Sequence, residues 1–377
     1  MTELVDRVRS AVETVIDPEL RLPLGELGMV GKISNNNGNV SIQIKLTIVG
    51  CPASERIRND VLASAMLTQG VSEAEITLDV MTDDERAEML KRLRPGGPKV
   101  NPFGPGTLTR VIAITSGKGG VGKSTITANL AIVLSALGYK VGILDADVYG
   151  FSIPKLMGIE HEGKTESPTR LNDMIVPLVN HDVKIISIGM FVENSNAAVA
   201  WRGPMLQRTI TQFLTDVYFG DLDFLLLDLP PGTGDVAITV GQQLPNAEVL
   251  VVTTGQSAAS DVAIRSGVVA RQTGQSILGV VENMGPLTLP DGSTLDLFGE
   301  GGADTVAAAL SIGQDKSVEV LGRIPLSIEI RQGGDIGYAV SASLPDHPAS
   351  QAFKDLAHKI IGAGPSRAGI NLGISPA

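Results

Sequence analysis

The sequence has one cysteine, Cys51, among 377 residues, so no disulfide can form within a single chain. A lone thiol is typical of proteins in a reducing compartment, and we expect a cytoplasmic protein. The chain also lacks an apolar run long enough to span a bilayer. Its first residues, MTELVDRVRS, are charged and amphipathic, unlike a signal peptide. Membrane-spanning and disulfide-rich secreted proteins are therefore not expected.

Basic residues are scarce: 30 Lys and Arg stand against 41 Asp and Glu, which gives a formal net charge of −11. Broad binding to nucleic acid or to an anionic membrane needs a basic field, so we expect neither as a partner. The four histidines, His161, His181, His347 and His358, are scattered through polar or terminal segments. That pattern is typical of solvated surface histidines and does not indicate a metal site.

Residues 1–94 have the pattern of a small α/β domain. The spacing of apolar residues predicts a helix over 4–16 that ends at Asp17-Pro18, and alternation predicts a strand over 40–48 after a turn at 35–38. A helix near 57–66, a strand that ends near residue 80 and a short charged helix up to residue 94 complete the domain.

The next segment, residues 95–107, reads PGGPKVNPFGPGT and is too rich in proline and glycine for regular structure. We expect a semi-rigid linker. At the other end of the chain, residues 366–377 are small and polar, which predicts a loose tail.

Between linker and tail, short apolar segments alternate with longer helical stretches. Several of them are apolar without alternation, as expected of strands buried on both faces of a parallel sheet. Residues 108–365 are therefore expected to form a doubly wound α/β domain with a mostly parallel sheet. The expected strands are VIAI, KVGILDAD, VKIISIGM, DFLLLDLP, AEVLVVTT, ILGVVENM and VEVLGRIP.

A glycine-rich segment, GKGGVGKS, fits the phosphate-binding pattern G-x-x-x-x-G-K-[ST] between an expected strand and an expected helix over 125–137. Backbone N–H groups of such a loop converge on phosphates, and the helix N-terminus adds positive charge. Lys123 would reach the β and γ phosphates of ATP, and Ser124 would bind Mg²⁺. The residues expected to bind ATP are Gly117, Lys118, Gly119, Gly120, Val121, Gly122, Lys123, Ser124 and Thr125.

Hydrolysis needs carboxylates near the phosphates, and two strand ends offer them. Asp145 and Asp147 follow one strand, and Asp228 ends another before the turn-rich loop PPGTG. One carboxylate would orient the attacking water and another would support Mg²⁺. For Asp145, a role as a cap of the next segment is equally compatible with the sequence.

These residues resemble a known family. KGGVGKS, with Lys118 at its start, resembles the deviant Walker A motif of the MinD/ParA/nitrogenase-iron-protein class. In that class the extra lysine reaches the nucleotide of a partner subunit, so the resemblance implies a homodimer. Without the resemblance, Lys118 is equally well explained as a solvated charge in the loop.

Within this class the match narrows to the Mrp (ApbC/Nbp-type) family of iron–sulfur cluster carriers. The motifs are DADVYGFSIPKLMG, WRGPMLQ, DLPPGTGDV, VVENM, FGEGG, GRIPL and IRQGGDIG. DPEL at 17–20 and TIVGCPAS at 47–54 resemble a small domain of metal–sulfur cluster assembly factors. The resemblance implies a slow, Mg²⁺-dependent ATPase that assists cluster assembly or transfer, with apo iron–sulfur proteins or assembly factors as partners.

The resemblance also implies roles for individual residues. Lys118, Lys123, Asp147 and Asp228 would be catalytic, with Ser124, Asp147 and Asp228 near Mg²⁺. Asn283 and Pro325 lie where the class recognises adenine. The signature Trp201-Arg202-Gly203-Pro204 has no role that we can assign.

The sequence departs from the family at one point. Cluster carriers usually have Cys-Pro-x-Cys after the ENM motif, but Leu289 and Gly292 stand at the two cysteine positions. Because clusters are held mainly by thiolates, the usual bridging site cannot form. Cys51 has two readings: a metal, cluster or thiol ligand whose pKa is lowered by a helix N-terminus, or a small buried apolar residue. The alternative function is an ATP-dependent regulatory or scaffold switch that has lost cluster binding.

Overall fold

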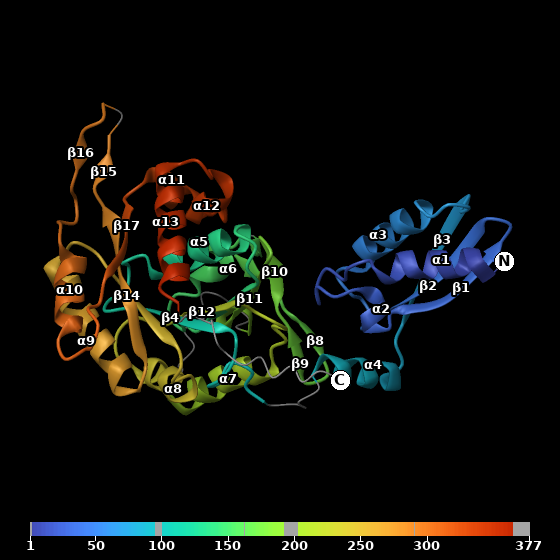
Figure 1. Ribbon diagram of the computed structural model, residues 1–377, viewed down its shortest axis with the longest axis horizontal. Helices are drawn as coiled ribbons and strands as arrows, with labels where there is room; N and C mark the ends of the chain where they lie inside the picture. The colour runs from blue at the N-terminus through green and yellow to red at the C-terminus, as the bar shows by residue number, and fades with distance from the viewer. Residues whose placement is uncertain (1, 95–99, 162, 192–202, 290, 365–377) are drawn as a thin grey trace. The chain divides into compact units, whose positions relative to one another are not determined.

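The computed structural model describes residues 2–94, 100–161, 163–191, 203–289 and 291–364. The chain divides into two compact units (Figure 1). The N-terminal unit comprises residues 1–100, 168–177 and 215–220, and the P-loop unit comprises the rest. Each unit is described by itself.

The N-terminal unit is built on a three-stranded sheet of order β1-β2-β3, in which β1 is antiparallel and β3 parallel to β2. Strand β2 alternates between buried and half-buried residues, as its sequence predicts. Helix α1 packs on the neighbouring strand β1, and α3 packs on β3. Its elements are α1 (Thr2–Glu13), α2 (Leu24–Leu27), β1 (Val30–Asn36), β2 (Asn39–Leu46), α3 (Ser54–Met66), β3 (Glu73–Val80), α4 (Asp83–Leu93), β8 (Thr169–Leu171) and β9 (Met174–Val176).

Two expectations for this unit need correction. The first helix ends at Glu13 and does not reach residue 16, because Asp17 organises a turn in which its Oδ1 accepts the N–H groups of Glu19 and Leu20. Strand β1 was not predicted. Its sequence, VGKISNN, carries too few apolar residues to reveal the alternation, and β2 supplies its pairing across the expected turn.

The core of the N-terminal unit includes residues that are distant in sequence. Leu171, Met174 and Val176, from β8 and β9, belong to one buried apolar cluster with Cys51 and residues of α1, α3 and the sheet. Two segments that lie within the range expected for the ATPase domain, 168–177 and 215–220, are therefore part of this unit.

The P-loop unit contains an eight-stranded sheet of order β10-β11-β5-β12-β4-β13-β14-β17. All neighbours are parallel except the edge pair β10–β11, so the doubly wound, mostly parallel fold is confirmed. All seven expected strands are present; the short edge strand β10 was not predicted. The strands are β4 (Arg110–Ser116), β5 (Val141–Asp145), β10 (Leu178–Asn180), β11 (Val183–Ser187), β12 (Phe224–Asp228), β13 (Glu248–Thr253), β14 (Ser276–Gly285) and β17 (Val320–Pro325).

Helices cover both faces of this sheet (Figure 1). One layer contains α5, α6, α11, α12 and α13, and the other contains α7, α8, α9 and α10. The central strands β4, β5 and β12 are buried along their whole length, which explains their unbroken apolar sequences. The helices are α5 (Lys123–Ala136), α6 (Ser152–Leu156), α7 (Gly203–Asp216), α8 (Asp235–Gln243), α9 (Ser257–Gln272), α10 (Gly302–Ser311), α11 (Ile328–Ile336), α12 (Val340–Ser343) and α13 (Pro348–Gly362), with a 3-10 turn η1 (Ile188–Phe191).

Short hairpins complete the unit: β6 (Glu160–His161) with β7 (Lys164–Thr165), and β15 (Leu287–Thr288) with β16 (Thr294–Leu295). The β15–β16 hairpin projects from the rest of the unit (Figure 1). No helix within the described ranges is both long and apolar enough to cross a membrane. The tail 366–377 and the linker residues 95–99 lie outside the described residues. From Asn101, the expected linker belongs to the P-loop unit, where Phe103 is buried.

Candidate nucleotide site

The glycine-rich segment connects the end of β4, at Ser116, to the start of α5, at Lys123. Gly122 has a φ of 83°, which favours glycine, and a Cβ there would lie 2.1 Å from Asn283 Nδ2. At Gly117 a Cβ would meet the backbone N of Ala263 at 2.3 Å. The loop is thus a close-packed backbone cradle at a helix N-terminus, the geometry that binds phosphates.

Lys123 is the centre of the charged cluster beside this cradle. Its Nζ lies 2.7 Å from Asp228 Oδ2 and 3.2 Å from Asp147 Oδ2, and all three side chains are buried. Burial alone would lower the pKa of Lys123, but the charges of Asp228 and Asp147 raise it above its usual value. The lysine therefore stays protonated.

Asp228 receives three hydrogen bonds. Ser124 Oγ donates to Oδ2 at 2.6 Å, Thr127 Oγ1 donates to Oδ1 at 2.7 Å, and Lys123 supplies the third. A hydroxyl and a carboxylate in contact at a phosphate cradle suit Mg²⁺, which takes few protein oxygens and completes its shell with phosphate and water. The described residues offer no separate group of three or more His, Cys, Asp or Glu side chains for a metal.

Asp145 is fully buried beside this cluster. Its Oδ2 accepts a hydrogen bond from Ser187 Oγ at 2.7 Å, and its Oδ1 accepts the N–H of Asp147 at 3.1 Å. Burial, followed by the charge of Asp228, raises the pKa of Asp145 to about 8. The geometry matches the capping role considered from the sequence, because the carboxyl holds the backbone that positions Asp147.

Lys118 projects differently from Lys123. Its Nζ donates to Gln256 Oε1 at 2.9 Å, on the exposed side of the loop. The turn-rich loop after Asp228 also adjoins the cradle, because the N–H of Gly232 donates to Ser116 O at 2.8 Å. The phosphate loop is therefore bordered on one side by the loop that follows β12 and on another by the start of α9.

Asn283 and Pro325, at the carboxyl ends of β14 and β17, line the same cleft as the phosphate loop. Asn283 Nδ2 donates to Val121 O at 2.9 Å and so braces the loop from the side. The cleft has a volume of about 880 Å³ and extends past Asp147 to Lys155, Thr165 and α11. That volume is enough for a nucleotide.

Cys51 lies between β2 and α3, as expected, and its surroundings match the second of its two readings, a small buried residue. The residue is 4% exposed, and its thiol donates to Glu19 Oε2 at 3.3 Å. Burial and then the negative charge of Glu19 raise the pKa of Cys51 to about 12, and together they outweigh the backbone hydrogen bond at Ala53, which lowers it. The thiol is therefore protonated and covered.

The two positions of the family's cysteine pair lie on the exposed β15–β16 hairpin. The N–H of Gly292 donates to Leu289 O at 2.9 Å, and Gly292 has a φ of 84°. Neither residue offers a side-chain ligand for iron. Trp201 and Arg202 lie outside the described residues.

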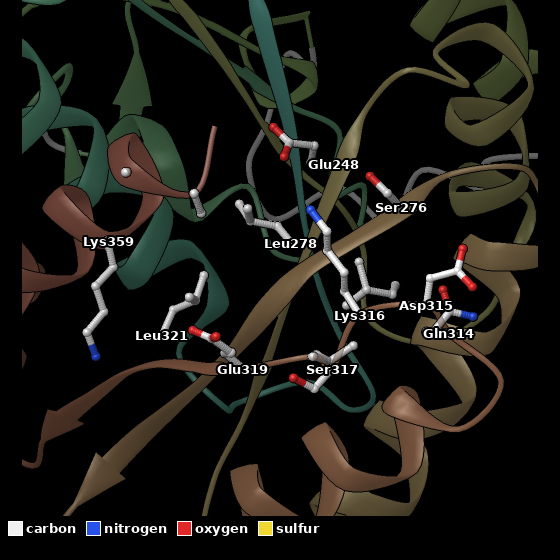
Figure 2. A pocket seen from close by; sticks show the side chains of 14 residues that line it. Glu248, Ser276, Leu278, Gln314, Asp315, Lys316, Ser317, Glu319, Leu321 and Lys359 are labelled. Atoms are coloured by element: carbon white, nitrogen blue, oxygen red, sulfur yellow. The ribbon is translucent and has the colours of Figure 1, made fainter. Parts of the chain in front are cut away.

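A second cavity, of about 710 Å³, is lined by residues at the amino ends of β13, β14 and β17 (Figure 2). The phosphate loop lies at the opposite, carboxyl ends of the strands. The cavity lining mixes acidic and basic side chains, including Glu248, Glu319, Lys316 and Lys359. Glu248 is paired with Arg110, so this carboxylate is part of the fold. This mixture of charges points to no particular ligand.

Sequence reasoning missed three partners of the site. Thr127 lies four residues after Lys123 on one helix face, a spacing that was available as a signal. Ser187 and Gln256 reach Asp145 and Lys118 only through the strand order of the sheet, and no local pattern marks them.

Comparisons with known proteins find relatives along nearly the whole chain. A family model described as NUBPL iron-transfer P-loop NTPase matches residues 107–361, and one described as iron-sulfur cluster assembly protein matches residues 5–77. The chain is 49% identical over 372 residues to an iron-sulfur cluster carrier protein of Mycobacterium tuberculosis, which covers 98% of this chain and 96% of the relative. A protein of the same description from Bacillus subtilis is 36% identical over 358 residues, covering 94% and 97%.

A solved structure is also similar. A nucleotide-binding protein from Archaeoglobus fulgidus in complex with ADP aligns with a TM-score of 0.52 and 33% identity. The alignment covers 72% of this chain and 96% of that one.

Proposed function

This chain belongs to the NUBPL iron-transfer P-loop NTPases, and on that premise we propose that it binds and slowly hydrolyses Mg·ATP to assist the transfer of iron–sulfur clusters to apoproteins. In this proposal, hydrolysis drives a conformational or dimer switch in a cytoplasmic protein. Residues 1–94 serve as the cluster assembly-type domain and 108–365 as the ATPase, joined by a linker over 95–107 and followed by a tail over 366–377.

The observation that carries the proposal is the convergence of Lys123, Ser124 and Thr127 on Asp228 at the end of the phosphate cradle. Lys123 would hold the β and γ phosphates, because it stays charged and its Nζ lies beside the helix N-terminus. Ser124 and Asp228 would hold Mg²⁺, which supplies charge neutralisation at the phosphates. Asp147, which lines the cleft beside Lys123, would orient the attacking water.

The remaining residues of the cleft would fix the nucleotide. The backbone from Gly117 to Thr125 would bind the phosphates, and Asn283 and Pro325 would border the adenine. Asn283 Nδ2 donates to Val121 O, and its Oδ1 can still accept a hydrogen bond from the adenine. Lys118, on the exposed side of the loop, would complete the site of a second copy in a homodimer.

The proposed cluster binding depends on which thiols the chain can offer to iron. With Leu289 and Gly292 at the family's cysteine positions, Cys51 is the one thiol that the chain can offer to iron. A dimer would contribute two such thiols, so a stable cluster needs further ligands from glutathione or from a partner protein. A chain that binds ATP but takes up no iron would instead be a regulatory or scaffold switch.

Anaerobic reconstitution tests this function. Wild type and Cys51→Ser are incubated with iron, sulfide and glutathione, and bound iron, sulfide and visible absorbance are measured with and without Mg·ATP. We expect substoichiometric, thiol-dependent uptake in wild type and none in Cys51→Ser. Equal uptake by both proteins would contradict the role of Cys51, and no uptake by either would favour the switch.

A further inference from the structure

A single carboxylate joins the Cys51 thiol to a distant segment of the chain. Glu19 accepts the thiol through Oε2 at 3.3 Å and the hydroxyl of Thr169 through Oε1 at 2.7 Å. Thr169 is 9% exposed and begins strand β8, 150 residues after Glu19. The side chain that faces the thiol is therefore itself held by the β8–β9 hairpin.

The same hairpin contributes apolar side chains to the buried core that contains Cys51. Leu171, Met174 and Val176 are nearly fully buried in the cluster that also contains Cys51 and Ala53. The hairpin is short, with three residues in each strand. Two-stranded hairpins of this length are marginally stable by themselves, so its position depends on these contacts.

The segment 215–220 pairs with the hairpin. Ile175 pairs with Val217 in an isolated bridge, and the N–H of Tyr218 donates to Ile175 O at 2.8 Å. Arg94, at the end of α4, donates to Asp216 O at 2.5 Å. The hairpin is thus held by the hydrogen bond from Thr169 to Glu19, by its buried apolar residues and by its pairing with segment 215–220, among other contacts.

We propose that the segment Pro168–Pro177 is a lid over the Cys51 thiol, latched by the hydrogen bond from Thr169 to Glu19. With the lid closed, Cys51 is only 4% exposed, so its thiol cannot meet a metal ion or a partner's thiol. Opening needs only the loss of local contacts, and not the unfolding of the unit. A function for the lid rests on the proposed role of Cys51 as an iron ligand. The lid itself can be tested without that role.

Because Cys51 is the only cysteine in the sequence, alkylation of the full-length protein reports on this one thiol. The rates of alkylation by iodoacetamide and by a bulky polyethylene-glycol maleimide are measured at fixed pH in wild type and in Thr169→Val, without nucleotide or iron. We expect the bulky reagent to react about fivefold faster with Thr169→Val, because a latch of one hydrogen bond is lost. The small reagent, which needs less opening, should gain less.

Two variants control this experiment. Thr169→Ser keeps the hydroxyl and should label at the wild-type rate with both reagents. Thr68→Val removes a hydroxyl of the same unit that bonds only to Ser64 O, and it should leave both rates unchanged. Wild-type rates in Thr169→Val, or equally raised rates in Thr169→Ser, would overturn the latch.

Urea separates local opening from unfolding. Labelling through a lid stays nearly constant at low urea, because little surface is exposed, whereas labelling through global unfolding rises with the slope of the unfolding transition. The second behaviour in wild type would overturn the lid. None of these rates requires ATP hydrolysis or cluster binding, so they remain interpretable if the proposed function fails.

Discussion

Lys123 Nζ lies 2.7 Å from Asp228 Oδ2, and the two residues are 105 positions apart in the chain. They meet because β4, which leads into the phosphate loop, pairs in parallel with β12, which ends at Asp228. Parallel strands bring their carboxyl ends to one edge of the sheet, so a loop after one strand faces a carboxylate on its neighbour. The sheet topology thus creates the nucleotide site, and the following predictions test its parts.

Replacement of Lys123 by alanine should abolish hydrolysis. The variant loses the cation beside the phosphates and leaves Asp228 and Asp147 without their buried counter-charge. We expect phosphate release to fall at least about 100-fold, and the free energy of unfolding to fall by about 3 kcal/mol or more. A coupled phosphate assay and urea unfolding measure the two effects. Full turnover in a folded Lys123→Ala protein would refute the assignment.

Asp228→Asn should change the Mg²⁺ requirement. The amide keeps one acceptor oxygen for Ser124 but loses the charge that attracts the metal. We expect the Mg²⁺ concentration for half-maximal hydrolysis to rise about tenfold or more. The matched control is Thr127→Val, which removes a hydrogen bond to the other oxygen of Asp228 and should cost about 1 kcal/mol of stability with little effect on Mg²⁺. If the Mg²⁺ concentration for half-maximal hydrolysis rose equally in both variants, the cause would be a loss of structure around Asp228 and not the loss of its charge.

Much of this site was accessible from the sequence because its parts are locally encoded. A strand buried on both faces has to be apolar, so FLLLD and its counterparts stood out without knowledge of their neighbours. The glycines before Lys123 are required where the backbone itself binds phosphate. Asp228 was placed correctly at a strand end for the same local reason.

What escaped prediction depends on contacts between distant segments. The pKa of Cys51 rises because the thiol is buried and because Glu19, 32 residues earlier, faces it, whereas the helix N-terminus alone suggested the opposite direction. Thr169 lies in a stretch with no strong periodicity, and its place in the N-terminal unit depends on which core accepts Leu171 and Val176. Local patterns carry no information on such a choice.

The buried carboxyl of Asp145 should make stability depend on pH. Its pKa of about 8 in the folded protein lies above the value of about 3.9 in an unfolded chain. Between these values the folded state holds a proton that the unfolded state releases, so the free energy of unfolding falls as pH rises from 4 to 8. Urea unfolding at pH 5 and pH 8, without nucleotide or Mg²⁺, measures the fall.

Asp145→Asn is the test of this assignment. The amide is neutral in both states and can still accept the N–H of Asp147, so the fall in stability between pH 5 and pH 8 should become smaller. An unchanged fall would place the responsible proton on another group.

Two glycines separate backbone strain from the shape of the nucleotide site. Gly122 and Gly138 have φ values of 83° and 91°, but a Cβ meets Asn283 at 2.1 Å only at Gly122, whereas nothing lies within 4 Å at Gly138. Alanine should cost about 1 kcal/mol of stability at either position through strain alone. We expect nucleotide affinity, measured by calorimetry, to fall about tenfold or more in Gly122→Ala and to stay unchanged in Gly138→Ala. Equal nucleotide affinities of the two variants would mean that the phosphate loop tolerates a displacement of Asn283.

Lys118 should matter for the second subunit and not for binding within its own. Its Nζ contacts Gln256 on the exposed side of the loop, whereas Lys123 points into the buried cluster. We expect Lys118→Ala to bind Mg·ATP within about threefold of wild type but to lose ATP-dependent dimers in analytical ultracentrifugation, together with hydrolysis.

Gln256→Ala keeps the lysine and removes a partner in the same chain that has to be released before the lysine can cross to another subunit. A symmetric dimer releases one such exposed hydrogen bond from each subunit, and each contributes about 0.5 to 1 kcal/mol, so dimerisation of Gln256→Ala should strengthen by about fivefold to thirtyfold. A Lys118→Ala protein that hydrolyses ATP as fast as wild type would make this lysine a loop charge, and the dimer would then need another basis.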